Sequence, residues 1–69
     1  MNNKSDWLDR METEARELEV RIEKLTLFLD NGGPISAKMR ALMMRQLGIM
    51  HLYASVLQER FICVIDEAE

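Results

Sequence analysis

The chain has 69 residues with one cysteine and one histidine, so we expect a single helical domain (residues 1–69) that neither an intrachain disulfide nor a structural zinc site can stabilise. Small domains that lack both usually depend on oligomerisation, which we expect here. The formal net charge of −3 is unlike the strongly basic character of a domain that binds nucleic acid uniformly, so we expect no DNA partner.

The first predicted helix runs from about Asp6 to Leu29. Ser5 is its expected N-cap, because a serine hydroxyl accepts a hydrogen bond from the first free N–H groups of a helix. A cluster of helix breakers follows it, Asp30-Asn31-Gly32-Gly33-Pro34, in which glycine supplies left-handed backbone and proline forbids continuation. Gly32 is the expected C-terminal stop of this helix.

The second predicted helix runs from about Ala37 to Ile65, with Ser36 as its expected N-cap. Gly48 lies inside it, where glycine costs about 1 kcal/mol relative to alanine. That cost indicates either a close backbone approach by a neighbour or simple tolerance. No segment of the chain has the pattern of a strand, so the predicted fold class is all-α.

Both predicted helices carry apolar residues alternately three and four positions apart, which is the spacing of a coiled-coil seam. The seam of the first helix is Leu8, Met11, Ala15, Leu18, Ile22, Leu25 and Leu29, and that of the second is Met43, Leu47, Met50, Ala54, Leu57, Phe61 and Val64. If the chain folds back on itself, each alanine faces a leucine, as interdigitating helical layers require. We therefore predict an antiparallel two-helix hairpin with a coiled-coil-like seam, with a short extra N-terminal helix as a further option.

The second helix carries another apolar stripe at seven-residue spacing, formed by Leu42, Ile49, Val56 and Cys63. A monomeric hairpin would leave this stripe exposed, so we predict a helical homo-oligomer. Gln46, Tyr53 and Arg60 are interleaved with it, and polar groups on a buried surface need partners. They either form hydrogen bonds across a subunit interface or line a ligand pocket between subunits. The expected interface residues are Leu42, Gln46, Ile49, Tyr53 and Val56.

The residues with reactive side chains do not form a catalytic constellation. Glu12 with Arg16 and Glu17 with Arg21 have the spacing of helix-surface ion pairs. His51 has no aspartate or cysteine near it in the sequence with which it could form a catalytic group, and Cys63 has no evident base beside it. No known phosphate-binding or catalytic motif is present. We expect no catalytic residue, no metal, no cofactor and no enzymatic activity.

The N-terminal segment is polar, and no apolar run approaches the roughly 20 residues that span a bilayer. We therefore expect a cytoplasmic protein with a reduced thiol and no membrane partner. The charge is divided along the chain, because residues 34–58 carry Lys38, Arg40 and Arg45 without a carboxylate while both flanking segments are acidic. A small, locally held anion is compatible with this division.

The order of residues resembles the phage anti-CBASS sponges, a family of very short helical phage proteins that sequester the cyclic oligonucleotide signals of a bacterial antiphage system. The resemblance covers most of the chain and rests on Glu17-Leu18, Arg21-Ile22, Lys24-Leu25 and Phe28-Leu29, then Gln46-Leu47, Met50, Tyr53, Leu57 and Arg60. It implies a helical homo-hexamer in the host cytoplasm that binds cyclic dinucleotides between protomers, and in some members cyclic trinucleotides at separate sites, without cleaving a bond.

The resemblance also implies ligand-binding residues. An aromatic residue near the N-terminus would stack on a base and a lysine of the first long helix would hold a phosphate, which gives Trp7, with the adjacent Arg10, and Lys24 for the dinucleotide site. Thr26 and Arg60 are the candidates for the trinucleotide site. Tryptophan replaces the tyrosine expected of the family, and the Gly32-Gly33-Pro34 turn differs from its more polar linker.

Two other functions remain open from the residues alone. A homodimeric four-helix bundle could bind structured RNA or a protein partner, although Lys38, Arg40 and Arg45 lie near one end of the hairpin instead of forming a continuous basic stripe. A purely structural assembly subunit would use Gln46, Tyr53 and Arg60 only to specify an interface.

Overall fold

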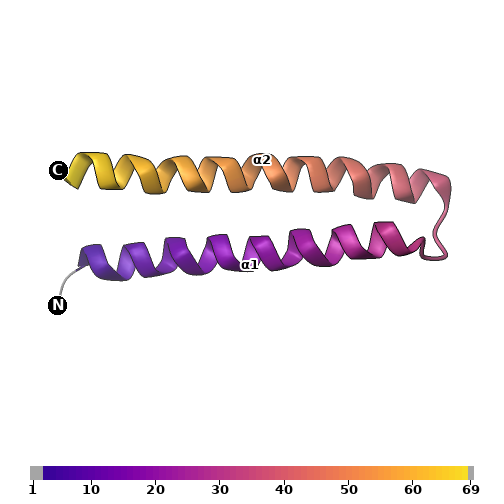
Figure 1. The fold of residues 1–69 in the computed structure, drawn as a ribbon, viewed down its shortest axis with the longest axis horizontal. Coiled ribbons are helices and arrows are strands. Elements are labelled where there is room, and N and C mark those ends of the chain that lie inside the picture. The colour runs from indigo at the N-terminus through magenta and orange to yellow at the C-terminus, as the bar shows by residue number, and fades with distance from the viewer. Residues whose placement is uncertain (1–2, 69) are drawn as a thin grey trace.

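The computed structural model describes residues 3–68, which form two α-helices, α1 (Asn3–Asn31) and α2 (Ala37–Ala68). The helices lie side by side and antiparallel, so that the start of α1 and the end of α2 are at the same end of the molecule (Figure 1). The molecule is elongated, with extents of 49 × 20 × 14 Å. Residues 3–68 contain no strand, which confirms the predicted all-α fold and is consistent with a hairpin.

The apolar residues that are shielded from solvent between the helices are those of the predicted seam. Three of its residues are buried, Met11, Leu18 and Leu57, and Leu57 is the most enclosed at 1% exposure. The other predicted seam residues of both helices are all half-buried, whereas most of their neighbours in sequence are exposed. Because burial of apolar surface contributes about 25 cal/mol per Å², this single seam is the main source of stability that one chain has by itself.

The chain reverses direction at two glycines. Gly32 has a φ of +67°, the left-handed conformation that L side chains rarely adopt, and it follows the last residue of α1. Gly33 leaves room for the ring of Phe28, because a Cβ atom at position 33 would lie only 2.7 Å from the ring carbon Cζ. The two glycines therefore have different roles, one in backbone conformation and the other in side-chain packing.

The start of α2 is fixed by two hydrogen bonds. The backbone N–H of Met39 donates to Oγ of Ser36 at 3.1 Å, which confirms Ser36 as the N-cap. Nη1 of Arg40 donates to the backbone carbonyl of Leu29 at 2.9 Å. The second bond occupies one of the carbonyl groups that the end of α1 leaves without a helical partner, so it ties the two helices together across the turn.

Both helices are longer than predicted. Helix α1 begins at Asn3, so Ser5 lies within the helix and the predicted N-cap is wrong, and no separate short helix precedes α1 in the described residues. Helix α1 ends two residues after Leu29, and α2 continues to Ala68. The additional residues lie before the first or after the last seam positions and contain no proline or glycine that would stop a helix, so backbone hydrogen bonding continues past the apolar pattern.

Candidate functional site

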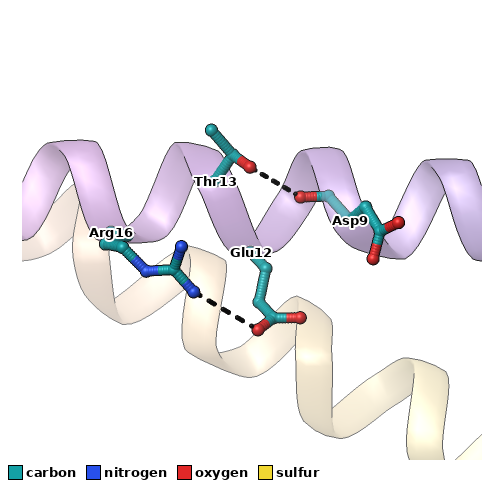
Figure 2. A network of polar contacts seen from close by, with 4 residues as sticks. All are labelled: Asp9, Glu12, Thr13 and Arg16. Carbon is teal, nitrogen blue, oxygen red and sulfur yellow. Dashed lines mark hydrogen bonds and ion pairs between the residues drawn. The ribbon is translucent and has the colours of Figure 1, made fainter.

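The outward face of α1 carries a shallow, basic hollow around Lys24. Arg16, Glu17, Val20 and Arg21 line it together with Lys24, so three cations and one carboxylate surround an apolar floor. The exposed Arg16 is partly neutralised by Glu12, whose Oε1 lies 3.5 Å from Nη2 of the arginine (Figure 2). Arg21 and Lys24 are left as the hollow's remaining cations, which can attract a phosphate.

The polar contacts drawn in Figure 2 are local to single turns of α1. Besides the Glu12–Arg16 pair, the hydroxyl of Thr13 donates to the backbone carbonyl of Asp9 at 2.9 Å. The other predicted ion pair, Glu17 with Arg21, does not form among the residues that the structure describes. Exposed pairs of this kind contribute about 0.3–0.5 kcal/mol each, so this face of α1 is free to rearrange around a ligand.

Trp7 and Arg10 lie on the first turns of α1. Both are exposed, and Trp7 keeps 43% of its surface in solvent, so part of this residue is accessible to a ligand base. Lys24 follows Trp7 by seventeen residues in the same helix, which corresponds to about 25 Å along the axis. One chain therefore does not bring these two candidates into a single pocket.

Thr26 lies in a cleft of about 390 Å³ between the helices, near the turn, where Asp30, Arg40 and His51 also contribute. Its hydroxyl donates to the backbone carbonyl of Ile22 at 2.7 Å. The hydroxyl proton is engaged by this bond while oxygen lone pairs stay available, so Thr26 can accept a hydrogen bond from a ligand without losing its own.

Arg60 is exposed in the last third of α2, far from Thr26. Thr26 lines the same cleft as Leu47 of α2, and the predicted seam, which pairs Leu25 with Leu47, makes Thr26 level with about residue 46. Fourteen residues of helix, or about 21 Å, separate that level from Arg60. The two trinucleotide candidates of one chain are thus almost as widely separated as Trp7 and Lys24.

The residues predicted to form a subunit interface are all exposed in the single chain. The apolar members Leu42, Ile49 and Val56 keep 49%, 59% and 52% of their surfaces in solvent, and Tyr53 keeps 42%. Gln46 is exposed beside them. Exposed apolar side chains gathered on one face are compatible with the predicted interface.

Cys63 is held in its thiol form by its neighbours. The Sγ–H group donates to Oε2 of Glu67 at 3.2 Å, and this hydrogen bond, with the negative charge of the same carboxylate, raises the pKa of the thiol above its ordinary value. A raised pKa leaves less thiolate at neutral pH, which makes the sulfur a weaker nucleophile. In the described residues, no group of three His, Cys, Asp or Glu side chains is arranged to hold a metal ion.

Arg40, which the sequence grouped only with Lys38 and Arg45 as part of a basic segment, has a structural role of its own at the turn. It is half-buried, bonds to Leu29 and lines the cleft that contains Thr26. A signal was present, because Arg40 precedes Met43 by three positions and thus continues the apolar seam of α2. A cation at this position of α2, beside the turn, can bond to the free carbonyl groups at the C-terminal end of α1.

Comparison with known proteins gives one family. The family model described as Sequestin matches residues 5–62, which include every candidate ligand-binding residue from Trp7 to Arg60. No curated protein and no solved structure matches the chain. Neither described helix is long and apolar enough to cross a membrane.

Proposed function

This chain belongs to the Sequestin family, and we propose that it binds cyclic di- and trinucleotide immune signals without cleaving them and thereby blocks CBASS antiphage defence in the host cytoplasm. Sequestins are phage anti-CBASS proteins that act as sponges for cyclic oligonucleotides. The observation that carries the proposal is the extent of the family match, because residues 5–62 contain the whole seam of α1, the turn and the candidate ligand residues.

The dinucleotide site that we propose lies between protomers. Since Trp7 and Lys24 are about 25 Å apart along one helix, a ligand that touches both takes them from two different chains. A cyclic dinucleotide has two phosphates and two flat bases, and its twofold symmetry suits a site built by two identical chains. Stacking on an aromatic side chain contributes about 1–3 kcal/mol per base, and Lys24 with Arg10 supplies charge for the phosphates.

The same reasoning extends to the trinucleotide candidates. Thr26 and Arg60 are about 21 Å apart along the hairpin, so a shared site for them also requires neighbouring chains. Arg60 would hold a phosphate and Thr26 would accept a hydrogen bond, as its bond to the carbonyl of Ile22 allows. We propose a homo-hexamer as the assembly that creates both kinds of site.

Native mass spectrometry with and without a panel of 3′,3′-linked cyclic dinucleotides and cyclic trinucleotides tests this function, because it reports subunit number and bound mass together. We expect a hexamer that gains the mass of intact ligands, and ligands recovered by denaturation that are chemically unchanged. Glu23→Ala, at the exposed position next to Lys24 on α1, is the matched control for Lys24→Ala and should not weaken binding.

A stable assembly that binds no cyclic oligonucleotide would contradict the sponge function and favour a structural subunit. A homodimer that binds structured RNA would instead favour the four-helix bundle. Recovery of a linear nucleotide that depends on His51 or Cys63 would contradict the non-catalytic role.

A further inference from the structure

The face of α2 that points away from α1 carries charges that are equally spaced on either side of one residue and opposite in sign. Lys38, Arg45, Leu52, Glu59 and Asp66 follow one another at seven-residue spacing, so they lie along one face of the helix, and all five are exposed. The two residues before Leu52 are basic and the two after it are acidic. Leu52 itself is the most exposed of the large apolar side chains, at 69%.

We propose that α2 packs antiparallel against α2 of a second copy of this chain, with the twofold axis at Leu52. In an antiparallel pair, residues at equal distances on either side of the axis lie at the same level. Arg45 of one copy is then level with Glu59 of the other, and Lys38 with Asp66, and the symmetry forms each pair twice. A parallel pair would instead place like charges side by side, which opposes association.

The residues beside this charged row complement one another in the same register. On one side are the small residues Ala41, Gly48 and Ser55, and on the other the larger Leu42, Ile49 and Val56. About the axis at Leu52, Gly48 shares a layer with Val56 of the second copy and Ser55 with Ile49. Large residues beside small ones allow two helices to approach closely, and a Cβ atom at Gly48 would meet nothing within 4 Å in the single chain.

The charge pattern identifies the occupant of this face as a second copy. A different partner would need only to complement the face, whereas a row whose first half complements its own second half is what a twofold contact requires. The exposed apolar residues of the face, Leu42, Ile49, Leu52 and Val56, provide the surface that such a contact would bury. This interface rests on the self-association that the proposed function requires, and it specifies one contact within it.

Charge reversal tests the pairing. Arg45→Glu and Glu59→Arg, made singly, bring like charges together twice per contact and should weaken self-association measured by sedimentation at least about tenfold. The double variant restores opposite charges between copies and should recover the association. Arg45 and Glu59 of one chain are about 21 Å apart along α2, so recovery cannot arise within a chain. Glu23→Arg, at an exposed position of α1, is the control and should leave the association unchanged.

Cysteine cross-linking tests the position of the axis. With Cys63→Ser as background, Leu52→Cys should form a disulfide-linked dimer on mild oxidation, because only residues at a twofold axis meet their own copies. Met44→Cys is the control, since Met44 is also well exposed in one chain, at 59%, and its two copies would lie about 24 Å apart. Faster cross-linking through residue 44 than through residue 52, or reversals at 45 and 59 without effect on sedimentation, would overturn the interface.

Ligand binding by the same samples separates this inference from the proposed function. An assembly that binds cyclic dinucleotides and is indifferent to the charge reversals overturns the α2 interface alone. A chain that sediments as an 8.1 kDa monomer and binds no cyclic nucleotide overturns both.

Discussion

Helices α1 and α2 contribute equally to the seam but differ in the faces they turn outward. Beyond its seam, α1 is mostly charged, and its exposed large apolar residues are Trp7, Val20, Leu27 and Phe28. Helix α2 exposes many more, namely Met39, Leu42, Met44, Ile49, Leu52, Tyr53, Val56, Ile62 and Ile65. An amphipathic helix of the first kind suits the surface of a protein, whereas a helix that is apolar on most sides is normally buried.

The contrast separates two tasks within one small chain. The outward face of α1 has cations around an open hollow, where a charged ligand can be bound while side chains stay hydrated. The outward face of α2 has few charges in its middle, and the ones it has change sign along the helix. We infer that α2 supplies contacts between copies and that α1 supplies most of the surface that meets the ligand.

The largest effect that we expect comes from a charge on the outward face of α2. If this face is covered in the assembly, Ile49→Glu buries an unpaired carboxylate, which costs about 3–5 kcal/mol, and the assembly dissociates or unfolds. Sedimentation velocity and circular dichroism measure the two outcomes. Leu27→Glu on α1 is the matched control, because Leu27 and Ile49 are similarly exposed in the single chain, at 54% and 59%. Equal tolerance of both substitutions would remove the distinction between the helices.

Truncation of the seam should have a similar or slightly smaller effect. Leu57 is 1% exposed, so Leu57→Ala leaves a cavity and lowers the free energy of unfolding by about 2–5 kcal/mol. Urea denaturation followed by circular dichroism measures it. Leu27→Ala, outside the seam, should change the free energy of unfolding by no more than about 0.5 kcal/mol. A small effect at position 57 would mean that the assembly is stabilised elsewhere than in the hairpin.

The ligand-binding role of α1 is tested by removing one cation. Lys24→Ala should weaken binding of a 3′,3′-linked cyclic dinucleotide by roughly 10- to 100-fold, because loss of a charge-assisted hydrogen bond costs about 1.5–3 kcal/mol. Calorimetry measures the affinity, and sedimentation should show an unchanged oligomer. Trp7→Ala should weaken binding comparably through lost stacking. If Lys24→Ala instead dissociates the oligomer while any remaining oligomer binds normally, the lysine belongs to an interface.

The smallest effect that we expect is the change in stability caused by Gly48→Ala. Its sign distinguishes an outward face of α2 that is exposed from one that is covered by a second copy. In an isolated hairpin, Gly48→Ala adds a methyl group that meets nothing within 4 Å, so helix propensity alone should stabilise the fold by about 1 kcal/mol. In the α2–α2 packing the methyl group enters the layer shared with Val56, and the gain disappears or reverses. Denaturation at two protein concentrations measures the difference. Gly32→Ala, at a φ of +67°, should be destabilising in both cases.

The sequence by itself determined the two helices, the turn and the seam, because a three-and-four apolar spacing leaves one face of each helix to be buried and a glycine–proline cluster leaves one place to reverse. Ser36 could be identified as a cap because capping is a contact between neighbours in sequence, and Met39 provides that contact. The family resemblance likewise depends only on residue order, and the match over residues 5–62 confirms it.

Only the tertiary structure decided where the helices end, what Arg40 contacts and which candidate site residues can meet within one chain. Ser5 has the character of a cap, yet α1 begins before it, since local signals compete with continued backbone hydrogen bonding. Arg40 reaches the carbonyl of Leu29 only because the hairpin closes. The distance between Trp7 and Lys24 follows from the 1.5 Å rise per residue of an unbroken helix, and that distance is too long for one chain to form alone the site that we propose for them.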